Sequence, residues 1–403
     1  GDVYKRQFSM SITMHAMTKT VPELLGVPEA ELEASHAIWT AREIAQQPRL
    51  LRRTHALIAD LHAQLQAFAA PIANDPAARV ILTGAGTSAY IGQCLAPLLD
   101  RALAARVDAV PTTDLVCAPQ LYLDPAQPLL LISFGRSGNS PESIAAVELT
   151  ESLVGDVRHL VVTCNAQGKL ATAPVRQAMT QTLPEETHDT SFAMTSSFSC
   201  MMYAALAALL PAGALDARIA PIAQATEAVI QDALPLLQSL ANARHDRVVY
   251  LGSGLFQGLA REATLKLGEL TNGAVATCYD SPLGFRHGPK TFVTAKTLVV
   301  VFVSNDPYTR RYDHDLIDEL RRDGVAARVI EISARPRSDD ADTLAVPGLA
   351  QAADVDLLWP YVAAAQIYAF LHARVRGVTP DNPNPAGIVN RVVQGVRLYA
   401  LES

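Results

Sequence analysis

Short apolar runs alternate with helical stretches along the chain from residue 79 onward. The runs do not alternate strictly between apolar and polar residues, which is typical of parallel strands that helices cover on both faces. The pattern therefore predicts α/β layers built on a parallel sheet. In the first half of the chain the predicted strands are Val80–Leu82, Arg106–Val110, Leu129–Ser133, Leu160–Thr163 and Thr180–Leu183.

The same pattern then starts again. The segment Val80–Gly86 (VILTGAG) is echoed by Val248–Gly254 (VVYLGSG), and each combines an apolar strand with a Gly-x-Gly turn. We therefore expect two similar lobes, because self-similarity at this scale indicates a repeated structural unit. In the second half the predicted strands are Arg247–Leu251, Ala274–Tyr279, Thr297–Val303, Ala327–Ile332 and Asp356–Trp359.

Helical segments precede and join the lobes. Glu29–Ala70 has apolar residues at helical spacing and is predicted to end near Pro71, and Leu215–Leu240 is predicted to be a helical bridge. We set residues 1–28 aside as an adapter-derived scar and a disordered lead, because Asp2–Gln7 looks like a translated sequencing adapter. The remaining predicted units are N-terminal helices (29–74), a first lobe (75–214), the bridge (215–240), a second lobe (241–380) and a C-terminal tail over the candidate site (381–403).

Composition narrows the choice of partner. The 403 residues include 33 Lys plus Arg and 40 Asp plus Glu, for a formal net charge of −7. Without clusters of positive charge we expect neither nucleic acid nor an anionic membrane as the partner. The longest apolar run, Cys200–Leu215, is interrupted by Pro211 and is shorter than the ~20 residues that span a bilayer. A small molecule is the expected partner.

Cysteine usage suggests a reducing compartment. The five cysteines are odd in number, lie far apart and form no CxxC or Cys/His cluster. We therefore expect neither a disulfide framework nor a metal site, and we expect the cytoplasm as the location.

Two loops after predicted strands carry candidate anion-binding groups. Gly84–Ala89 fits the dinucleotide pattern G-x-G-x-x-A, with Asp108 where a ribose-binding acid would lie, and equally fits a tight strand-to-helix turn. Its Gly86, Thr87 and Ser88 place an amide and two hydroxyls at a helix N-terminus, which favours a phosphate. The second loop, Ser133–Ser143, offers Arg136, Ser137, Gly138 and Ser140 before Pro141, and it is either a phosphate cradle or a serine-rich helix cap.

Three further segments carry candidate chemistry. The loop His188–Ser197 adds the hydroxyls of Thr195 and Ser196, and its His188 is either a general acid or an ordinary loop histidine. On the helix that begins near Leu255, spacings of four and three place Glu262, Lys266 and Glu269 on one face, either toward the same crevice or as a surface charge ladder. The loop Ser281–Lys290 presents His287 for proton transfer or as a turn residue.

Together these motifs resemble the double sugar isomerase (SIS) domain family, and within it the galactosamine-6-phosphate deaminase/isomerases, formerly called tagatose-6-phosphate ketose/aldose isomerases. The resemblance implies two flavodoxin-like αβα sandwiches with parallel sheets, preceded by N-terminal helices. It rests on the segments Leu82–Ser88, Ser133–Ser140, Phe192–Ser197, Ser281–Pro282, Phe285–Lys290 and Val389–Gly395.

The resemblance also implies roles for individual residues. By similarity to the isomerase half of glucosamine-6-phosphate synthase, Glu269 matches the base that moves a proton between C1 and C2, and Lys266 and Glu262 match supporting charges. His287 matches a ring-opening histidine that reaches in from the neighbouring subunit, which implies a homo-oligomer with its site near the subunit interface. Arg391 stands where that relative has a catalytic lysine, which argues against a Schiff-base step because a guanidinium is not nucleophilic at neutral pH.

The matching phosphate-loop residues are Thr87, Ser88, Ser137 and Ser140, with Arg136 where the relative has glutamine. The resemblance implies no cofactor. A complete synthase is excluded because it needs an N-terminal cysteine nucleophile, whereas the first cysteine here is Cys94. Our hypothesis is therefore a sugar-phosphate enzyme that converts galactosamine 6-phosphate and water to tagatose 6-phosphate and ammonia. The alternatives are a ketose/aldose isomerase without deamination, a non-catalytic sugar-phosphate sensor and a dehydrogenase, and the sequence leaves the C4 epimer open.

Overall fold

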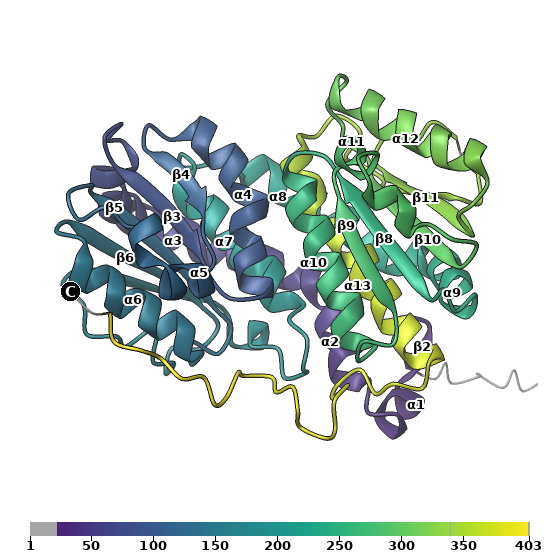
Figure 1. Cartoon of the computed structure of the whole chain (residues 1–403), viewed down its shortest axis with the longest axis horizontal. Helices are drawn as coiled ribbons and strands as arrows, with labels where there is room; N and C mark the ends of the chain where they lie inside the picture. The colour runs from purple at the N-terminus through teal and green to yellow at the C-terminus, as the bar shows by residue number, and fades with distance from the viewer. Residues whose placement is uncertain (1–21, 339, 402–403) are drawn as a thin grey trace, which may run out of the picture.

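Two five-stranded parallel sheets form the framework of the computed structural model, which describes residues 22–338 and 340–401 (Figure 1). The first sheet has the order β4-β3-β5-β6-β7, with β3 (Arg79–Thr83), β4 (Arg106–Ala109), β5 (Leu129–Gly135), β6 (Val157–Thr163) and β7 (Ala178–Thr182). The second has the order β12-β11-β10-β8-β9, with β8 (Arg247–Gly252), β9 (Ala276–Asp280), β10 (Thr297–Phe302), β11 (Arg328–Ser333) and β12 (Thr343–Ala345). The expectation of two parallel α/β sandwiches is confirmed.

Helices cover both faces of each sheet. The first sheet has α3 (Gln47–Ala73), α4 (Thr87–Ala102) and α7 (Ser196–Leu209) on the face toward the other lobe, and α5 (Thr112–Cys117) and α6 (Pro141–Leu153) on the outer face. The second sheet has α8 (Asp216–Asp232), α9 (Leu234–Asn242), α10 (Leu255–Leu270) and α13 (Asp354–Val375) on its inner face, and α11 (Pro282–Phe285) and α12 (Thr309–Asp323) on the outer face. One apolar core therefore runs through both lobes, and each outer face has a smaller core of its own.

The repeated glycine turn is visible in the backbone. Gly86 precedes α4 with φ +55° and ψ −128°, and Gly254 precedes α10 with φ +58° and ψ −123°. A side chain would strain both positions because φ is positive. The two lobes therefore use the same strand-to-helix turn, and α4 and α10, the helices that follow these turns, pack against each other between the lobes.

The N-terminal region forms α1 (Glu29–Ala34), α2 (Ile38–Ala45) and α3, as the apolar spacing predicted. Pro71 does not end α3, which continues to Ala73. Residues 22–28, which we expected in a disordered lead, form a short hairpin of β1 (Glu23–Leu24) and β2 (Val27–Pro28) with Leu25 and Val27 buried. The predicted scar falls on residues 1–21, outside the described residues.

One predicted strand is wrong. Asp356–Trp359 lies in α13, a helix that is buried on all sides, and the fifth strand of the second sheet is Thr343–Ala345 instead. A helix that is buried all round has the same continuous apolar run as a buried strand, so the pattern could not separate the two. None of the described helices is both long and apolar enough to cross a bilayer.

Candidate active site

A hollow of about 220 Å³ opens at the carboxyl ends of β3 and β5, where ligands bind in open α/β sheets. Residues of both predicted phosphate loops line this hollow, which we call the phosphate hollow. They are Gly86, Thr87, Ser88, Arg136, Ser137, Gly138 and Ser140. The structure therefore brings together two loops that are about fifty residues apart in the sequence.

Two helices begin at the phosphate hollow. Thr87 and Ser88 form the first turn of α4, and Ser140 directly precedes Pro141, the first residue of α6. The backbone amides of a helix's first turn lack intrahelical partners and carry a partial positive charge. Two such ends and several hydroxyls at one hollow suit an anion such as a phosphomonoester.

The second phosphate loop is held from behind by the next strand connection. Asn165 Nδ2 donates to the carbonyl of Ser137 at 2.9 Å, and Thr163 Oγ1 donates to the carbonyl of Gly135 at 2.6 Å. Gly138 has φ +64°, a conformation that favours glycine. These contacts fix the loop's shape before a ligand arrives, which reduces the ordering cost of binding.

Arg136 is almost fully buried and is used mostly within the protein. Its Nη1 donates to the carbonyls of Ser191 and Phe192, each at 3.1 Å, and its Nη2 donates to the carbonyl of Arg391 at 3.2 Å. Burial, followed by the nearby Arg391, lowers the Arg136 pKa to about 10, so the guanidinium stays charged at neutral pH. Arg136 thus adds positive charge to the phosphate hollow and ties a loop and the C-terminal tail to it.

The second lobe contributes Glu269, which lines the phosphate hollow. Lys266 Nζ lies 2.9 Å from Glu269 Oε2 and 3.3 Å from Glu262 Oε1, and it donates to Thr87 Oγ1 at 3.2 Å. Because Lys266 and Glu262 are buried, the trio is not a surface charge ladder. Glu269 is partly exposed, so this carboxylate is the one of the pair that a ligand can reach.

The electrostatics of α10 depend on this burial. Burial raises the pKa of Glu262 to about 7, against the opposing effect of Lys266 and with help from Glu269. Burial works against the charge of Lys266, but Glu262 and Glu269 outweigh it, and the lysine pKa is raised. Lys266 therefore remains a cation beside Glu269 at neutral pH and can stabilise negative charge that develops there.

His287 lies apart from the phosphate hollow in the single chain. It is exposed and does not line the hollow, and its loop is held by ion pairs of Arg286 and Lys290 with Glu319 on α12, the former at 2.8 Å. The structure therefore brings Glu262, Lys266 and Glu269 to the phosphate loops but does not bring His287 there.

Several other predicted residues also lie outside the hollow. Thr195 and Ser196 are buried at the start of α7, where the amide of Thr195 donates to Asp189 Oδ2 at 2.8 Å and Ser196 Oγ donates to Asp189 Oδ1. These two residues hold their own loop together instead of facing the phosphate hollow. Burial lowers the pKa of His188, helped by Arg391 and Arg136, so its imidazole is neutral at pH 7 and is a poor proton donor.

Asp108 does not act as a free ribose-binding acid. Its carboxylate pairs with Arg79 at 2.6 Å and with Arg106 at 3.0 Å. Both arginines compete with any sugar hydroxyl for this carboxylate, which weakens the dinucleotide interpretation.

Residues that were not predicted individually, from two segments that were, complete the lining. Phe192 and Met194 come from the loop before α7, and the tail supplies Val389, Asn390, Val393 and the predicted Arg391. In Figure 1 the tail, drawn in yellow, runs from the end of α13 along the lower edge of both lobes and ends near α6. Both segments lie within the motifs that carried the family resemblance, and the loop before α7 was also singled out by its hydroxyl groups.

A second, larger cavity of about 630 Å³ adjoins the first on the α10 side. It shares Phe192, Glu269 and Val389 with the phosphate hollow and continues past Arg261 to Tyr279. Arg261 lies over the rings of Tyr90 and Tyr279, with its guanidinium carbon 4.8 Å and 5.5 Å from their centroids. Glu269 therefore stands at the border between a small polar hollow and a wider cavity.

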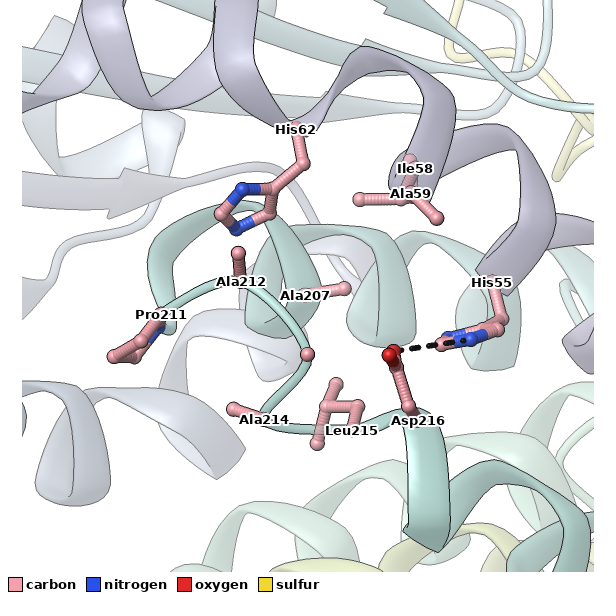
Figure 2. A pocket seen from close by; sticks show the side chains of 11 residues that line it. His55, Ile58, Ala59, His62, Ala207, Pro211, Ala212, Ala214, Leu215 and Asp216 are labelled. Carbon is pink, nitrogen blue, oxygen red and sulfur yellow. Dashed lines mark ion pairs between the residues drawn. The ribbon is translucent and has the colours of Figure 1, made fainter.

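A third hollow lies elsewhere, between α3 and the start of α8 (Figure 2). His55 Nε2 approaches Asp216 Oδ1 at 3.5 Å, while His62 Nε2 bonds the carbonyl of Leu210 at the other end of the hollow. Within residues 22–338 and 340–401, no three His, Cys, Asp or Glu side chains come together in a way that could hold a metal ion. The predicted site residues all lie away from this hollow.

Comparison with known proteins gives concordant results. The model of the SIS domain family matches residues 75–211 and 239–342. D-galactosamine-6-phosphate deaminase AgaS of Escherichia coli O157:H7 is 46% identical over 375 residues, which is 91% of this chain and 97% of that protein. The protein of the same name from Shewanella sp. strain ANA-3 is 46% identical over 368 residues, which is 90% of this chain and 92% of that protein. The crystal structure of tagatose-6-phosphate ketose/aldose isomerase from Escherichia coli superimposes with a TM-score of 0.81 at 43% identity, covering 91% of this chain and 97% of that one.

Proposed function

The chain belongs to the SIS domain family, and from that membership we propose that it is an amino-sugar phosphate deaminase that converts galactosamine 6-phosphate and water to tagatose 6-phosphate and ammonia. The observation that carries the proposal is the position of Glu269, a carboxylate from the second lobe, in the hollow that the phosphate loops of the first lobe form. The names of the relatives at 46% identity support the same reaction.

The first step is capture of the phosphate. Hydroxyls and amides of Thr87, Ser88, Ser137 and Ser140 hold the ester in the phosphate hollow, and Arg136 supplies positive charge beside it. These contacts are the same in the ground state and the transition state. Their role is therefore to bind and orient the sugar, so their loss should raise KM more than it lowers kcat.

Proton transfer follows at the sugar's other end. After the ring opens, the sugar has an aldehyde at C1 and an amine at C2, and Glu269 removes the proton from C2. The electron pair of that C–H bond moves toward the carbonyl, and Lys266, 2.9 Å from Glu269, stabilises the negative charge. Glu269 then returns a proton to C1 while one proton of the C2 amine passes to the C1 oxygen, which converts the enolamine to a ketimine at C2 with a hydroxyl at C1.

Hydrolysis of the ketimine completes the reaction. Water adds to C2, the carbon–nitrogen bond breaks, and ammonia leaves with both hydrogens of the water, so that the C2 ketone of tagatose 6-phosphate remains. No covalent bond to the protein is needed. Arg391, which lines the hollow, helps to bind the substrate and does not form a Schiff base, because a guanidinium is not a nucleophile at neutral pH. Its side chain donates hydrogen bonds to the carbonyls of Asp189 and Ser191.

His287 is assigned to ring opening in a homo-oligomer. It is exposed on its own chain, and a partner subunit that inserts this loop beside Glu269 would supply the imidazole. The wide cavity next to Glu269 leaves room for such a loop. With five free cysteines, a reducing cytoplasm is the location that we propose for the enzyme.

An assay of two products tests the function. The purified chain is incubated with galactosamine 6-phosphate, and ammonia and ketose phosphate are both measured, with glucosamine 6-phosphate as the epimer control. Stoichiometric release of both products from the galacto substrate is expected. Failure to release ammonia from either amino sugar would refute the deaminase assignment.

A ketose/aldose isomerase is the second candidate, because the solved structure at 43% identity has that name. An isomerase needs the same phosphate hollow and the same proton transfer by Glu269, but it acts on a sugar with a hydroxyl at C2. Interconversion of tagatose 6-phosphate and its aldose without any ammonia from the amino sugar would favour this candidate.

A further inference from the structure

Glu43, on helix α2, is a buried carboxylate that the mechanism above does not use. Its side chain accepts hydrogen bonds from the backbone amide of Thr190 and from the amide of Ser191 at 3.1 Å, and it also accepts one from Ser191 Oγ. An α-helix from the N-terminal region therefore holds two successive amides of the loop that precedes α7. We refer to residues 189–193 as the carbonyl loop.

The backbone carbonyls of the carbonyl loop accept hydrogen bonds from two arginines that line the phosphate hollow. The carbonyls of Ser191 and Phe192 accept from Arg136 Nη1, each at 3.1 Å, and the Ser191 carbonyl also accepts from Arg391 Nε at 3.2 Å. Arg391 Nη2 donates to the carbonyl of Asp189. The loop is thus held by Glu43 on its inner side and orients both arginines of the hollow on its outer side.

The side chain of Asp189 secures the other end of the same loop. Its Oδ2 accepts from the amides of Thr195 at 2.8 Å and Ser197 at 2.9 Å. The amide of Phe192 donates to the carbonyl of Asp381 in the tail at 3.1 Å, and the amides of Thr190 and Ser191 are held by Glu43 from α2. A carboxylate that is too short or absent at position 43 would leave the amides of Thr190 and Ser191 unpaired, the latter buried, and the loop would move to satisfy them.

We propose that Glu43 is a positioning residue for substrate binding, acting through the carbonyl loop on Arg136 and Arg391. The inference rests on the proposed function, since it concerns the same phosphate hollow. Glu43 does not touch the hollow itself. The length and direction of the Glu43 side chain hold the carbonyl loop in place, because they put the carboxyl oxygens within hydrogen-bond reach of the loop's amides.

The charges around Glu43 fit this role. Burial and the nearby Asp189 raise its pKa to about 8, although the bonds from Ser191 and Thr190 oppose the rise. Arg136 from the β5–α6 loop lies near both Glu43 and Asp189, and Arg391 from the tail and His188 lie beside Asp189. At pH 7 the Glu43 side chain is mostly uncharged, so what the loop requires is a correctly placed acceptor more than a charge.

Two conservative variants separate length from charge. Glu43→Gln keeps the length and one acceptor oxygen for both amides, and Ser191 Oγ can accept from the new amide while it donates to the carbonyl of Ala193. Glu43→Asp keeps the acid but withdraws its oxygens by one methylene. We expect Glu43→Gln to bind tagatose 6-phosphate within about threefold of the unaltered chain, and Glu43→Asp to bind it on the order of tenfold more weakly, measured by calorimetry.

Kinetics add a readout that a purely structural role would not move. KM for galactosamine 6-phosphate should rise in Glu43→Asp while kcat changes little, because a phosphate contact is made equally in ground and transition states. In an Arg136→Ala background the further effect of Glu43→Asp should shrink, since both act through one contact chain. If Glu43→Asp does not fold, Ser191→Ala, which removes one hydroxyl bond to Glu43, should still raise KM a few-fold.

Gln47 provides the matched control. It begins α3 four residues after Glu43, is equally buried, and bonds Gln366 Oε1 at 2.8 Å and the hydroxyl of Ser199, away from the phosphate hollow. Gln47→Ala should lower the Tm without changing Kd or KM. Equal binding changes in Gln47→Ala and Glu43→Asp, or full binding in Glu43→Asp, would overturn the inference. A native chain that binds no sugar phosphate would instead refute the proposed function.

The pH dependence of stability gives a further check. Because the pKa of Glu43 is higher in the folded state than its ordinary 4.5, its contribution to stability is complete below about pH 4.5 and is lost as pH rises to about 8. Glu43→Gln cannot titrate. The Tm of the native chain should therefore fall more steeply than that of Glu43→Gln between pH 5 and pH 8. If the two Tm–pH curves were parallel, Glu43 would not be a buried, uncharged carboxyl, and the expected near-native binding of Glu43→Gln would lose its basis.

Discussion

At the scale of single residues, the environment of Glu269 separates it from Glu262, although both lie on one face of α10. Glu262 is fully buried and its pKa is raised to about 7, whereas Glu269 is partly exposed at the border of the phosphate hollow. Two carboxylates beside one lysine have thus been given different surroundings, and in active sites such a difference separates a reacting group from a supporting one.

Glu269→Gln should remove the proton transfer while it preserves the shape of the hollow. We expect kcat to fall by about 10² to 10⁴, the usual contribution of a general base, with KM nearly unchanged. Ammonia release under saturating substrate is the measurement. Glu148→Gln, at an exposed position on α6, is the control and should keep full turnover. Unchanged kcat in Glu269→Gln would remove this residue from the mechanism.

At the scale of secondary-structure elements, the site depends on how closely α10 approaches α4. A Cβ at Gly258 would lie 2.8 Å from the backbone N of Cys94 and 2.8 Å from the carbonyl carbon of Gln93. Real side chains do not tolerate such distances to backbone atoms. The glycine therefore lets the two helices touch, and this contact brings Lys266 within 3.2 Å of Thr87 across the lobes.

Gly258→Ala should push the helices apart and lower stability by about 1–3 kcal/mol, the usual cost of overpacking. Thermal unfolding measures the loss, and a drop in kcat is expected as Glu269 shifts relative to the phosphate loops. Gly268→Ala is the control on the same helix, because a Cβ there meets nothing within 4 Å. That variant should gain roughly 0.5–1 kcal/mol from the better helix propensity of alanine. A Gly258→Ala protein as stable as the Gly268→Ala one would contradict the close approach.

At the scale of the whole molecule, the site uses both lobes and the tail. The tail carries Arg391 to the phosphate hollow and then runs to α5 and α6, where Val396–Leu401 line a further hollow with Val116 and Leu149. His287 is still missing from this arrangement in a single chain. A complete site under the proposed mechanism thus needs a second copy.

Mixing two inactive variants tests the shared site. Glu269→Gln and His287→Ala chains, refolded together at equal amounts, should form mixed dimers in which one of two sites has both native residues. About one quarter of all sites would then be intact, following random pairing of a symmetric dimer. Ammonia release from the mixture, compared with each variant alone, is the measurement. No recovery, in a mixture shown to contain mixed dimers, would place His287 outside the active site.

Short sequence patterns predicted much of this fold. Strand periodicity and the repeated VILTGAG and VVYLGSG segments predicted two parallel α/β lobes, and glycine, serine and threonine after β3 and β5 predicted two loops that the structure places around one hollow. These predictions hold because a strand, a turn or a helix end depends on neighbours in the sequence. The wrong strand at Asp356–Trp359 marks the limit, since burial on all sides erases the difference between helix and strand.

Tertiary structure alone decided which of the candidate residues share one hollow. Thr195 and Ser196 have the same hydroxyls as Thr87 and Ser88, yet packing buried the first pair, with the Thr195 amide and the Ser196 hydroxyl bonded to Asp189, and placed the second pair at the phosphate hollow. Likewise, no local pattern distinguishes Glu43 from any other helix glutamate. Its partners are about 150 residues away in the sequence, and contacts at such distance form when the whole core packs, not when a single helix does.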